Sequence, residues 1–248
     1  MAGGYSRPRA PGRSVTLLIA ALALAWLGAG FEAASAAEVS DFALHEVEPA
    51  GGLAKIGDVD RDGHADIIIV QSQHLVWLAY PELPRHVIRD GDFFGSDRFA
   101  VVDMDNDGDL DIVTSRRDPG FFGSLLPRHL LQALSLEPYR IYWYENPLPA
   151  ADPAIGANWV EHPIGDQRSY IKDIVAGDIN RDGRMDVVAR PTEHTVIYFA
   201  KQSGWTTRTV THPPDEGLAL GDLDRDGDLD LVLNGFWLET PPDPETGT

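Results

Sequence analysis

The sequence contains no cysteine and comparatively little basic charge. Without cysteine the chain can form neither disulfide bonds nor thiolate metal sites. Its 20 Lys and Arg residues are outnumbered by 39 Asp and Glu residues, which gives a formal net charge of −19. Nucleic acids and anionic membranes both require a basic face on their partner. We therefore expect no nucleic acid among the partners of this protein.

The sequence also lacks the short motifs that accompany common enzyme chemistry. It contains no Gly-x-Ser-x-Gly nucleophile elbow, no His-Glu-x-x-His zinc motif and no phosphate-binding loop. The absence of cysteine excludes a thiol nucleophile. Carboxylates are abundant, but 17 of the 39 acidic residues fall inside four short loops that have another explanation. We therefore predict that the chain is not an enzyme.

Only one long apolar run occurs, and it lies near the N-terminus. Three arginines within the first 13 residues precede an apolar stretch at 15–30 and a small-residue sequence, Ala34-Ser35-Ala36. This order predicts a signal peptide over residues 1–37 and export to the periplasm or the extracellular space. An uncleaved anchor is the alternative. No second run reaches the roughly 18 residues of a membrane span, so none is expected in the mature chain, 38–248.

One nine-residue pattern occurs four times in the remaining sequence. It has Asp or Asn at positions 1, 3, 5 and 9 and glycine at position 6, and an apolar run follows each copy. The copies lie at residues 58–66, 103–111, 178–186 and 222–230. Their first residues are separated by 45, 75 and 44 positions. Such a period indicates an array of similar structural units.

The repeated pattern suits a calcium ion. Calcium takes six to eight oxygen ligands, and a short loop with alternate carboxylates and a glycine turn can supply most of them. We expect side-chain oxygens from positions 1, 3, 5 and 9, and a backbone carbonyl from position 7, whose side chain should point outward. The predicted ligands are Asp58, Asp60, Asp62, His64, Asp66, Asp103, Asp105, Asp107, Asp109, Asp111, Asp178, Asn180, Asp182, Arg184, Asp186, Asp222, Asp224, Asp226, Asp228 and Asp230.

The four loops differ in charge, and none is an EF-hand. The third loop is the weakest candidate, because Asn180 replaces an aspartate and Arg184 adds a positive neighbour. An EF-hand requires a bidentate glutamate at position 12. This position holds Ile69, Thr114, Ala189 and Leu233. In an exported protein without disulfides, the bound calcium is expected to stabilise the fold rather than to signal.

Apolar residues around each loop predict four short strands per unit. The continuous apolar run after each loop indicates a strand that is covered on both faces. An aromatic strand follows each loop: Trp77 and Tyr198 lie 19 and 20 residues after their loop starts, whereas Trp143 lies 40 after, because of the extra residues in the second unit, and Trp237 lies 15 after. A further, outer strand is expected around Phe42, Leu83, Trp159 and Trp205. Four strands in about 45 residues are typical of a propeller blade, with the acidic loop between its first two strands.

With their flanking strands, the Asp-x-Asp-x-Asp-Gly-x-x-Asp loops resemble the FG-GAP/VCBS repeats of bacterial exported proteins and of the integrin alpha-chain propeller. The sequence Trp143-Tyr144-Glu145-Asn146-Pro147 is similar to the bacterial branch. The resemblance extends from Phe42 to about Leu238, and it implies an all-β fold of calcium-binding propeller blades. It also implies that ligands bind on the face opposite the calcium loops. Among the loops between blades we select Arg98, Arg168 and Tyr170 as candidate ligand contacts.

The sequence accounts for about 3.5 blades, whereas integrin-type propellers have seven. The strand around Phe42 is expected to be the outer strand of a blade whose first three strands are missing. Residues 239–248 stop where the outer strand of the last blade is due. We interpret the chain as an incomplete or open propeller from a truncated or split reading frame. An open arc and a small oligomer are the alternatives.

Residues 117–138 interrupt the second unit. The sequence that begins at Pro127 has the apolar spacing of a helix, with proline near its first turn. The insertion is either a lid or partner-binding flap over one propeller face or a segment packed on the second blade, and the second interpretation is favoured.

The expected function is binding. We predict a non-catalytic, calcium-stabilised module that binds a protein or a glycan outside the cytoplasm. A fragment of a propeller-containing carbohydrate-active enzyme, of the polysaccharide lyase or sugar dehydratase type, is the alternative. A fragment without activity is a third possibility. The sequence does not identify the ligand.

Overall fold

The computed structural model describes residues 43, 45–48, 52–93, 98–118, 125–127, 129–130, 139–191, 194–213 and 217–247. The predicted signal peptide and most of the insertion lie outside these residues. The chain divides into two units, Met1–Glu46 and Val47–Thr248. All the strands belong to the second unit. Within the described residues, no helix has the length and apolarity that crossing a membrane requires.

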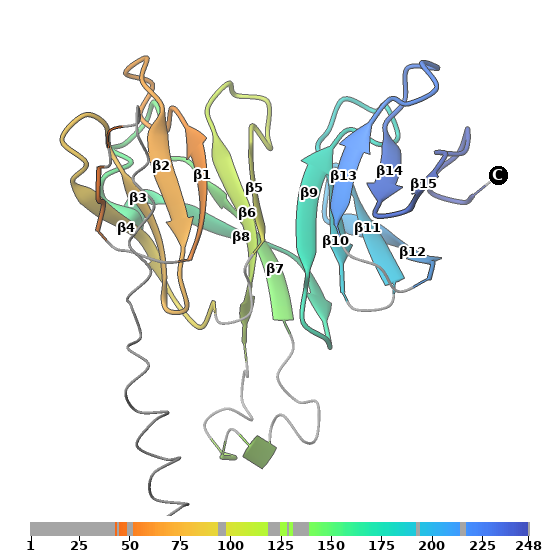
Figure 1. Cartoon of the computed structure of the whole chain (residues 1–248), viewed down its shortest axis with the longest axis horizontal. Coiled ribbons are helices and arrows are strands. Elements are labelled where there is room, and N and C mark those ends of the chain that lie inside the picture. The colour runs from red at the N-terminus through yellow and green to blue at the C-terminus, as the bar shows by residue number, and fades with distance from the viewer. Residues whose placement is uncertain are drawn as a thin grey trace, which may run out of the picture. The chain divides into compact units, whose positions relative to one another are not determined.

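The strands form four antiparallel sheets, in each of which neighbouring strands are consecutive in sequence (Figure 1). The first sheet contains β1 (Leu53–Gly57), β2 (Asp66–Val70), β3 (His74–Leu78) and β4 (Arg85–Asp90). The second contains β5 (Phe99–Val102), β6 (Asp111–Arg117), β7 (Tyr139–Glu145) and β8 (Val160–Gln167), with the short helix η1 (Gly156–Asn158) before β8. The third contains β9 (Asp173–Gly177), β10 (Asp186–Arg190), β11 (His194–Ala200) and β12 (Trp205–Thr211). The fourth contains β13 (Leu218–Gly221), β14 (Asp230–Leu233) and β15 (Phe236–Leu238).

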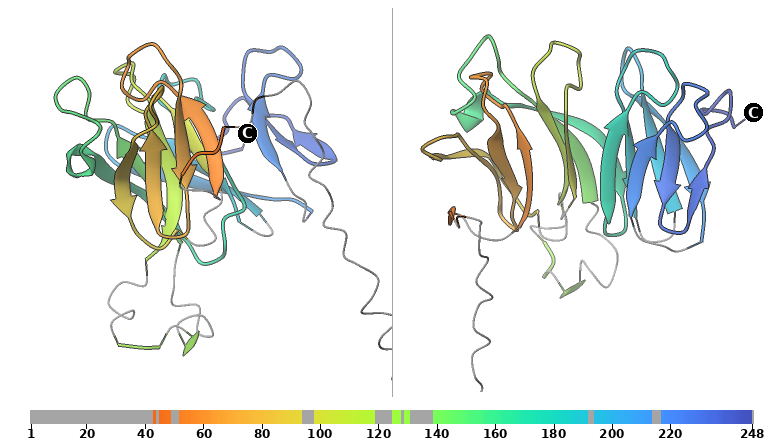
Figure 2. Two further views of the ribbon diagram at one scale, coloured as in Figure 1. Left: turned by 60° about the vertical axis from the view of Figure 1, so that its left-hand side comes forward. Right: turned by 45° about the horizontal axis from the view of Figure 1, so that its top comes forward.

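This arrangement confirms the predicted all-β fold of propeller-like blades. Three sheets have four strands, and the fourth has three within the described residues. Each acidic loop lies in the hairpin between the first two strands of its sheet, as predicted. These hairpins extend from one end of the sheets (Figures 1 and 2), and the links from one sheet to the next lie at the other end.

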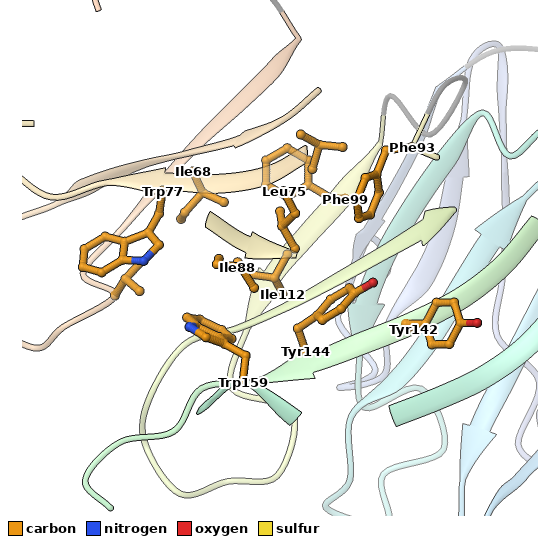
Figure 3. Packing of buried hydrophobic residues seen from close by; sticks show 12 residues of the cluster. Ile68, Leu75, Trp77, Ile88, Phe93, Phe99, Ile112, Tyr142, Tyr144 and Trp159 are labelled. Atoms are coloured by element: carbon orange, nitrogen blue, oxygen red, sulfur yellow. The ribbon is translucent and has the colours of Figure 1, made fainter. Parts of the chain in front are cut away.

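Consecutive sheets pack against one another through three apolar cores. The first core joins Ile68 and Leu75 of the first sheet to Ile112 and Tyr144 of the second (Figure 3). A second core joins the second and third sheets, and a third core joins the third and fourth. Every residue of β10 is buried because cores lie on both faces of its sheet. The run after the third loop is therefore continuously apolar because its strand is covered on both faces, as predicted.

The outer strands predicted around Leu83, Trp159 and Trp205 are present as β4, β8 and β12, but the first begins later than predicted. Leu83 lies before β4 and has a left-handed φ of 56°, so it belongs to a turn and not to the strand. Phe42 lies outside the described residues, and residues 45–48 form no strand. Val47 instead packs against Ile69 and Leu78 of the first sheet. The sequence alignment placed Leu83 in a strand because a residue that packs on the face of a sheet is apolar, as a strand residue is.

The insertion begins later than predicted. β6 continues through Arg117, whose backbone N–H donates to the carbonyl of Asp92 at 2.8 Å. Arg117 is 5% exposed, so it belongs to the sheet. Of residues 118–138 the structure describes 118, 125–127 and 129–130, and the predicted helix after Pro127 falls largely outside them.

Candidate metal sites

The four acidic loops share one backbone geometry. The glycine at position 6 has φ between 85° and 92° in every copy, which only glycine adopts without strain. Its N–H donates to the carboxylate at position 1 over 2.9–3.2 Å. The N–H of position 5 donates to the side chain at position 3, and the N–H of position 7 donates to that at position 5. These bonds curl each loop around its own side-chain oxygens.

In three loops the side-chain oxygens converge. One oxygen from each of three aspartates lies within 4.8 Å of the others. The groups are Asp58, Asp60 and Asp62 in the first loop, Asp103, Asp105 and Asp111 in the second, and Asp222, Asp224 and Asp226 in the fourth. The third loop has no such acidic group within the described chain. Its Asn180 instead donates to Glu245 at 2.9 Å.

The residues present fit a calcium ion. Calcium is a hard cation that prefers oxygen ligands, and these loops offer oxygen alone. Asp58 Oδ1 is shielded from solvent and has no hydrogen-bond partner among the described residues, although buried polar atoms normally have one. In the second loop, burial and then the Asp107 carboxylate raise the pKa of Asp105. A cation would satisfy the unpaired oxygen and offset the repulsion between the carboxylates.

The aspartate at position 9 also fastens its loop to the sheet. Its carboxylate accepts one hydrogen bond from the N–H of position 2, over 2.8–3.1 Å. It accepts a second from a residue at or just beyond the end of the third strand, over 2.8–3.0 Å. These four residues, Asp66, Asp111, Asp186 and Asp230, are fully buried. The sequence indicated a metal ligand here but not this second, structural role.

The prediction for position 7 was wrong in two loops. His64 and Arg184 are exposed, as expected, but Asp109 and Asp228 are only 2% and 5% exposed. Arg181 of the third loop donates to Asp228 at 2.6 Å. Burial, followed by the Asp107 carboxylate, raises the pKa of Asp109 to about 7, while Arg61 opposes this shift. The preceding loop therefore bonds directly to Asp228, whereas neither carboxylate oxygen of Asp109 has a hydrogen-bond partner within the described residues.

Contacts from position 4 connect each loop to the next. Arg61 donates to the carbonyl of Asp107 at 3.2 Å, and Asn106 donates to the carbonyl of Gly183 at 2.9 Å. Arg181 makes the third such contact, with Asp228. A signal was present in the sequence, because arginine at position 4 is followed by aspartate at position 7 of the next loop. Where position 4 is Asn106, the next position 7 is instead Arg184.

Without calcium, the protein should lose stability as the pH rises from about 5 to 8. Burial raises the pKa of Asp111 to about 8 and that of Asp186 to about 6, with the backbone hydrogen bonds opposing both shifts. An unfolded aspartate has a pKa of about 3.9. At any pH between this value and the raised pKa of the folded chain, the folded chain binds more protons than the unfolded chain. The free energy of unfolding therefore falls as the pH rises.

This pH dependence can be measured by urea unfolding at pH 5, 6, 7 and 8 in buffer stripped of calcium. The variant Asp111→Asn cannot titrate at this position and should give a flatter profile. A free energy of unfolding that stayed constant or increased with pH would contradict the expectation.

The structure brings together two of the three candidate ligand contacts. Arg98 and Tyr170 line one cavity of about 310 Å³ at the starts of the inner strands, the end opposite the acidic loops. Arg168 is exposed and does not line this cavity. The sequence did not select Lys172 and Arg190, which line the same cavity.

Comparison with known proteins agrees with this geometry. Residues 178–233 match the family model described as an FG-GAP-like repeat. This segment begins with the third acidic loop and ends with the last residue of β14. The search of curated proteins gave no match. The matched segment is therefore an FG-GAP-like repeat, and the other sheets have the same loop and strand order.

Proposed function

We propose that this protein is an extracytoplasmic, calcium-binding propeller module that binds a protein or a glycan and is not itself catalytic. The observation that carries the proposal is the fourfold acidic loop, in which three copies bring carboxylate oxygens within 4.8 Å of one another. The shielded, unpaired Asp58 Oδ1 supports a cation at such a site.

Calcium has a structural role in this proposal. Positions 1, 3 and 5 of each loop would hold the ion together with position 9, which is also bonded to the end of the third strand. When bound, the ion supplies the positive charge that the acidic loops lack. Because position 4 of each loop contacts the next loop, ordering one loop also supports its neighbour.

The binding role is assigned to the opposite end of the sheets. The links between sheets lie there, and loops on a rigid scaffold are common positions for recognition. Export is supported by the basic, apolar and small-residue order of the first 37 residues. It also agrees with the calcium supply, because extracellular modules bind calcium with dissociation constants of ~10⁻⁴ to 10⁻³ M.

The number of bound ions tests the calcium assignment. The chain should be purified from the exported fraction, its intact mass recorded to locate any cleavage, and its metal content measured after dialysis against millimolar calcium. We expect at least three calcium ions per chain. The variant Asp105→Asn should lose one ion, whereas the control Asp90→Asn, outside the loops, should lose none. A chain that retains no calcium, or that retains magnesium equally well, would reject the assignment.

A further inference from the structure

Positive charge gathers at the end of the sheets opposite the acidic loops. Arg98, Lys172 and Arg190 line the cavity of about 310 Å³. A second cavity of about 240 Å³ shares Arg98 with the first and adds Lys55. Asp173 is the one acidic residue that lines either cavity within the described chain. This excess of positive charge occurs in a chain whose net charge is −19.

The fold brings these side chains together from distant parts of the sequence. Leu53, Phe99, Asp173 and Leu218, which line the two cavities, are the first residues of β1, β5, β9 and β13. These strands are the first of their four sheets, and β9 contacts both β5 and β13. The cavities are therefore a shared property of the sheet array and not of a single loop.

The single carboxylate is already neutralised. Arg190 is 1% exposed and donates to Asp173 through Nε at 2.7 Å and through Nη2. Arg98 approaches the other oxygen of Asp173, with Nε and Oδ1 at 3.7 Å. Two guanidinium groups therefore share one carboxylate. Because Arg190 already neutralises Asp173, Arg98 adds a positive charge that no further carboxylate among the described residues of the cavity lining balances.

Arg98 is accessible to a ligand. Its side chain is 53% exposed. Its hydrogen bond within the described residues is donated by Nε to the carbonyl of Lys172, at 3.0 Å. Lys55 adds a second charge nearby, with its Nζ 5.5 Å from the centroid of the Phe99 ring. Partial desolvation of the ammonium group, followed by repulsion from Arg98, lowers the pKa of Lys55. An anion bound between them would relieve this repulsion.

The cavity walls indicate what kind of anion fits. Tyr170 lines the larger cavity, and Leu218 lines both. Phe99 lines the smaller cavity but is only 2% exposed, with Lys55 Nζ 5.5 Å from its ring centroid, so Tyr170 alone is the aromatic candidate for contact with a sugar ring. A guanidinium group binds a carboxylate with two parallel hydrogen bonds. A volume of about 310 Å³ is at the small end of the range for ligand pockets. It suits one sugar unit better than an extended peptide.

We propose that these two adjoining cavities, which share Arg98, bind the carboxylate of an acidic sugar unit of a glycan, with Arg98 as the principal contact, Tyr170 on the side of the larger cavity and Lys55 on the side of the smaller one. The proposal rests on the proposed binding function and narrows it to one ligand class. It requires no step of bond formation or cleavage.

Binding of small glycosides tests this proposal. The probes are methyl glycosides of galacturonate, glucuronate and N-acetylneuraminate, each compared with its methyl ester, which has the same ring without the charge. We expect at least one acid to bind about tenfold or more tightly than its ester in calorimetry with calcium present, because charge-assisted hydrogen bonds are the stronger class. Binding should weaken as salt is raised.

Variants assign the binding to the cavity. Arg98→Gln should weaken binding of the acid about tenfold or more, and Lys55→Gln should weaken it to a smaller extent. Arg168→Gln is the matched control, because Arg168 lies on the link between β8 and β9 but does not line the cavity. Melting curves of each variant confirm that the fold is retained.

Three results with the sugar probes would overturn the proposal. They are equal binding of acid and ester, an affinity of Arg98→Gln that matches that of Arg168→Gln, and failure of all three acids to bind. An acidic peptide that binds in an Arg98-dependent manner while the sugars do not would also overturn it. Binding of a neutral glycan or of a protein would leave the broader binding function in place while rejecting this cavity as an acidic-sugar site.

Discussion

Removal of calcium is expected to lower the melting temperature of the protein by about 10 °C. At about 1 mM calcium and a dissociation constant of ~0.1 mM, each site contributes ~1.4 kcal/mol to the free energy of unfolding. The three loops with converging carboxylates would together contribute about 4 kcal/mol, a large part of the stability of an ordinary domain. For a domain of this size, each kcal/mol changes the melting temperature by about 2–4 °C.

The measurement is a pair of melting curves, one in millimolar calcium and one in excess EGTA, followed by calcium addition to test reversal. Magnesium at the same concentration is the control, because magnesium requires an octahedral site and dehydrates reluctantly. The triple variant Asp60→Asn, Asp105→Asn and Asp224→Asn should melt at nearly the same temperature in both buffers. An unchanged melting temperature in EGTA for the original chain would contradict a structural role for calcium.

The sheets were predictable because their signals are local. Each hairpin is indicated by a few consecutive residues, namely the glycine at position 6 of the loop and the apolar run that follows it. The aromatic strand around Trp143 follows within the same sheet. The start of β4 was misplaced, because Leu83, like Val47, is apolar for packing against the first sheet and not for strand pairing.

The features that sequence reasoning missed depend on contacts between sheets. Asp109 is buried beside the preceding loop, from which Arg61 donates to the neighbouring carbonyl of Asp107, an arrangement that only the packing of two sheets creates. The basic cavity was not predicted for the same reason, because its residues come from different sheets. Arg98 was selected from its place between blades, but Lys55 and Arg190 come from other sheets, and nothing in their local sequence indicates a shared site.

The variant Asp111→Ala is expected to lower the free energy of unfolding by about 2–4 kcal/mol even when calcium is absent. Asp111 is fully buried and accepts hydrogen bonds from the N–H groups of Met104 and Asn146, both at 2.8 Å. Alanine leaves these two donors without a partner, at a cost of roughly 1–3 kcal/mol for each. Removing the carboxyl also relieves the unfavourable burial that raises the pKa of Asp111 to about 8, so the total lies below the sum.

The comparison with Asp105→Ala in the same loop separates the two roles of the acidic residues. Asp105 is exposed and accepts one long hydrogen bond from Asp107, at 3.3 Å, so its loss should matter only when calcium is present. The free energies of unfolding of both variants should be measured with urea in calcium-free buffer at pH 6. At this pH Asp111 is largely protonated, so the charge of its carboxylate contributes little to the difference in stability. Asp111→Asn, which keeps one acceptor oxygen, should fall between the original chain and Asp111→Ala. Equal stability of the two alanine variants in that buffer would mean that Asp111 acts through the metal alone. A larger loss for Asp111→Ala would mean that it fastens the loop to the third strand before any ion binds.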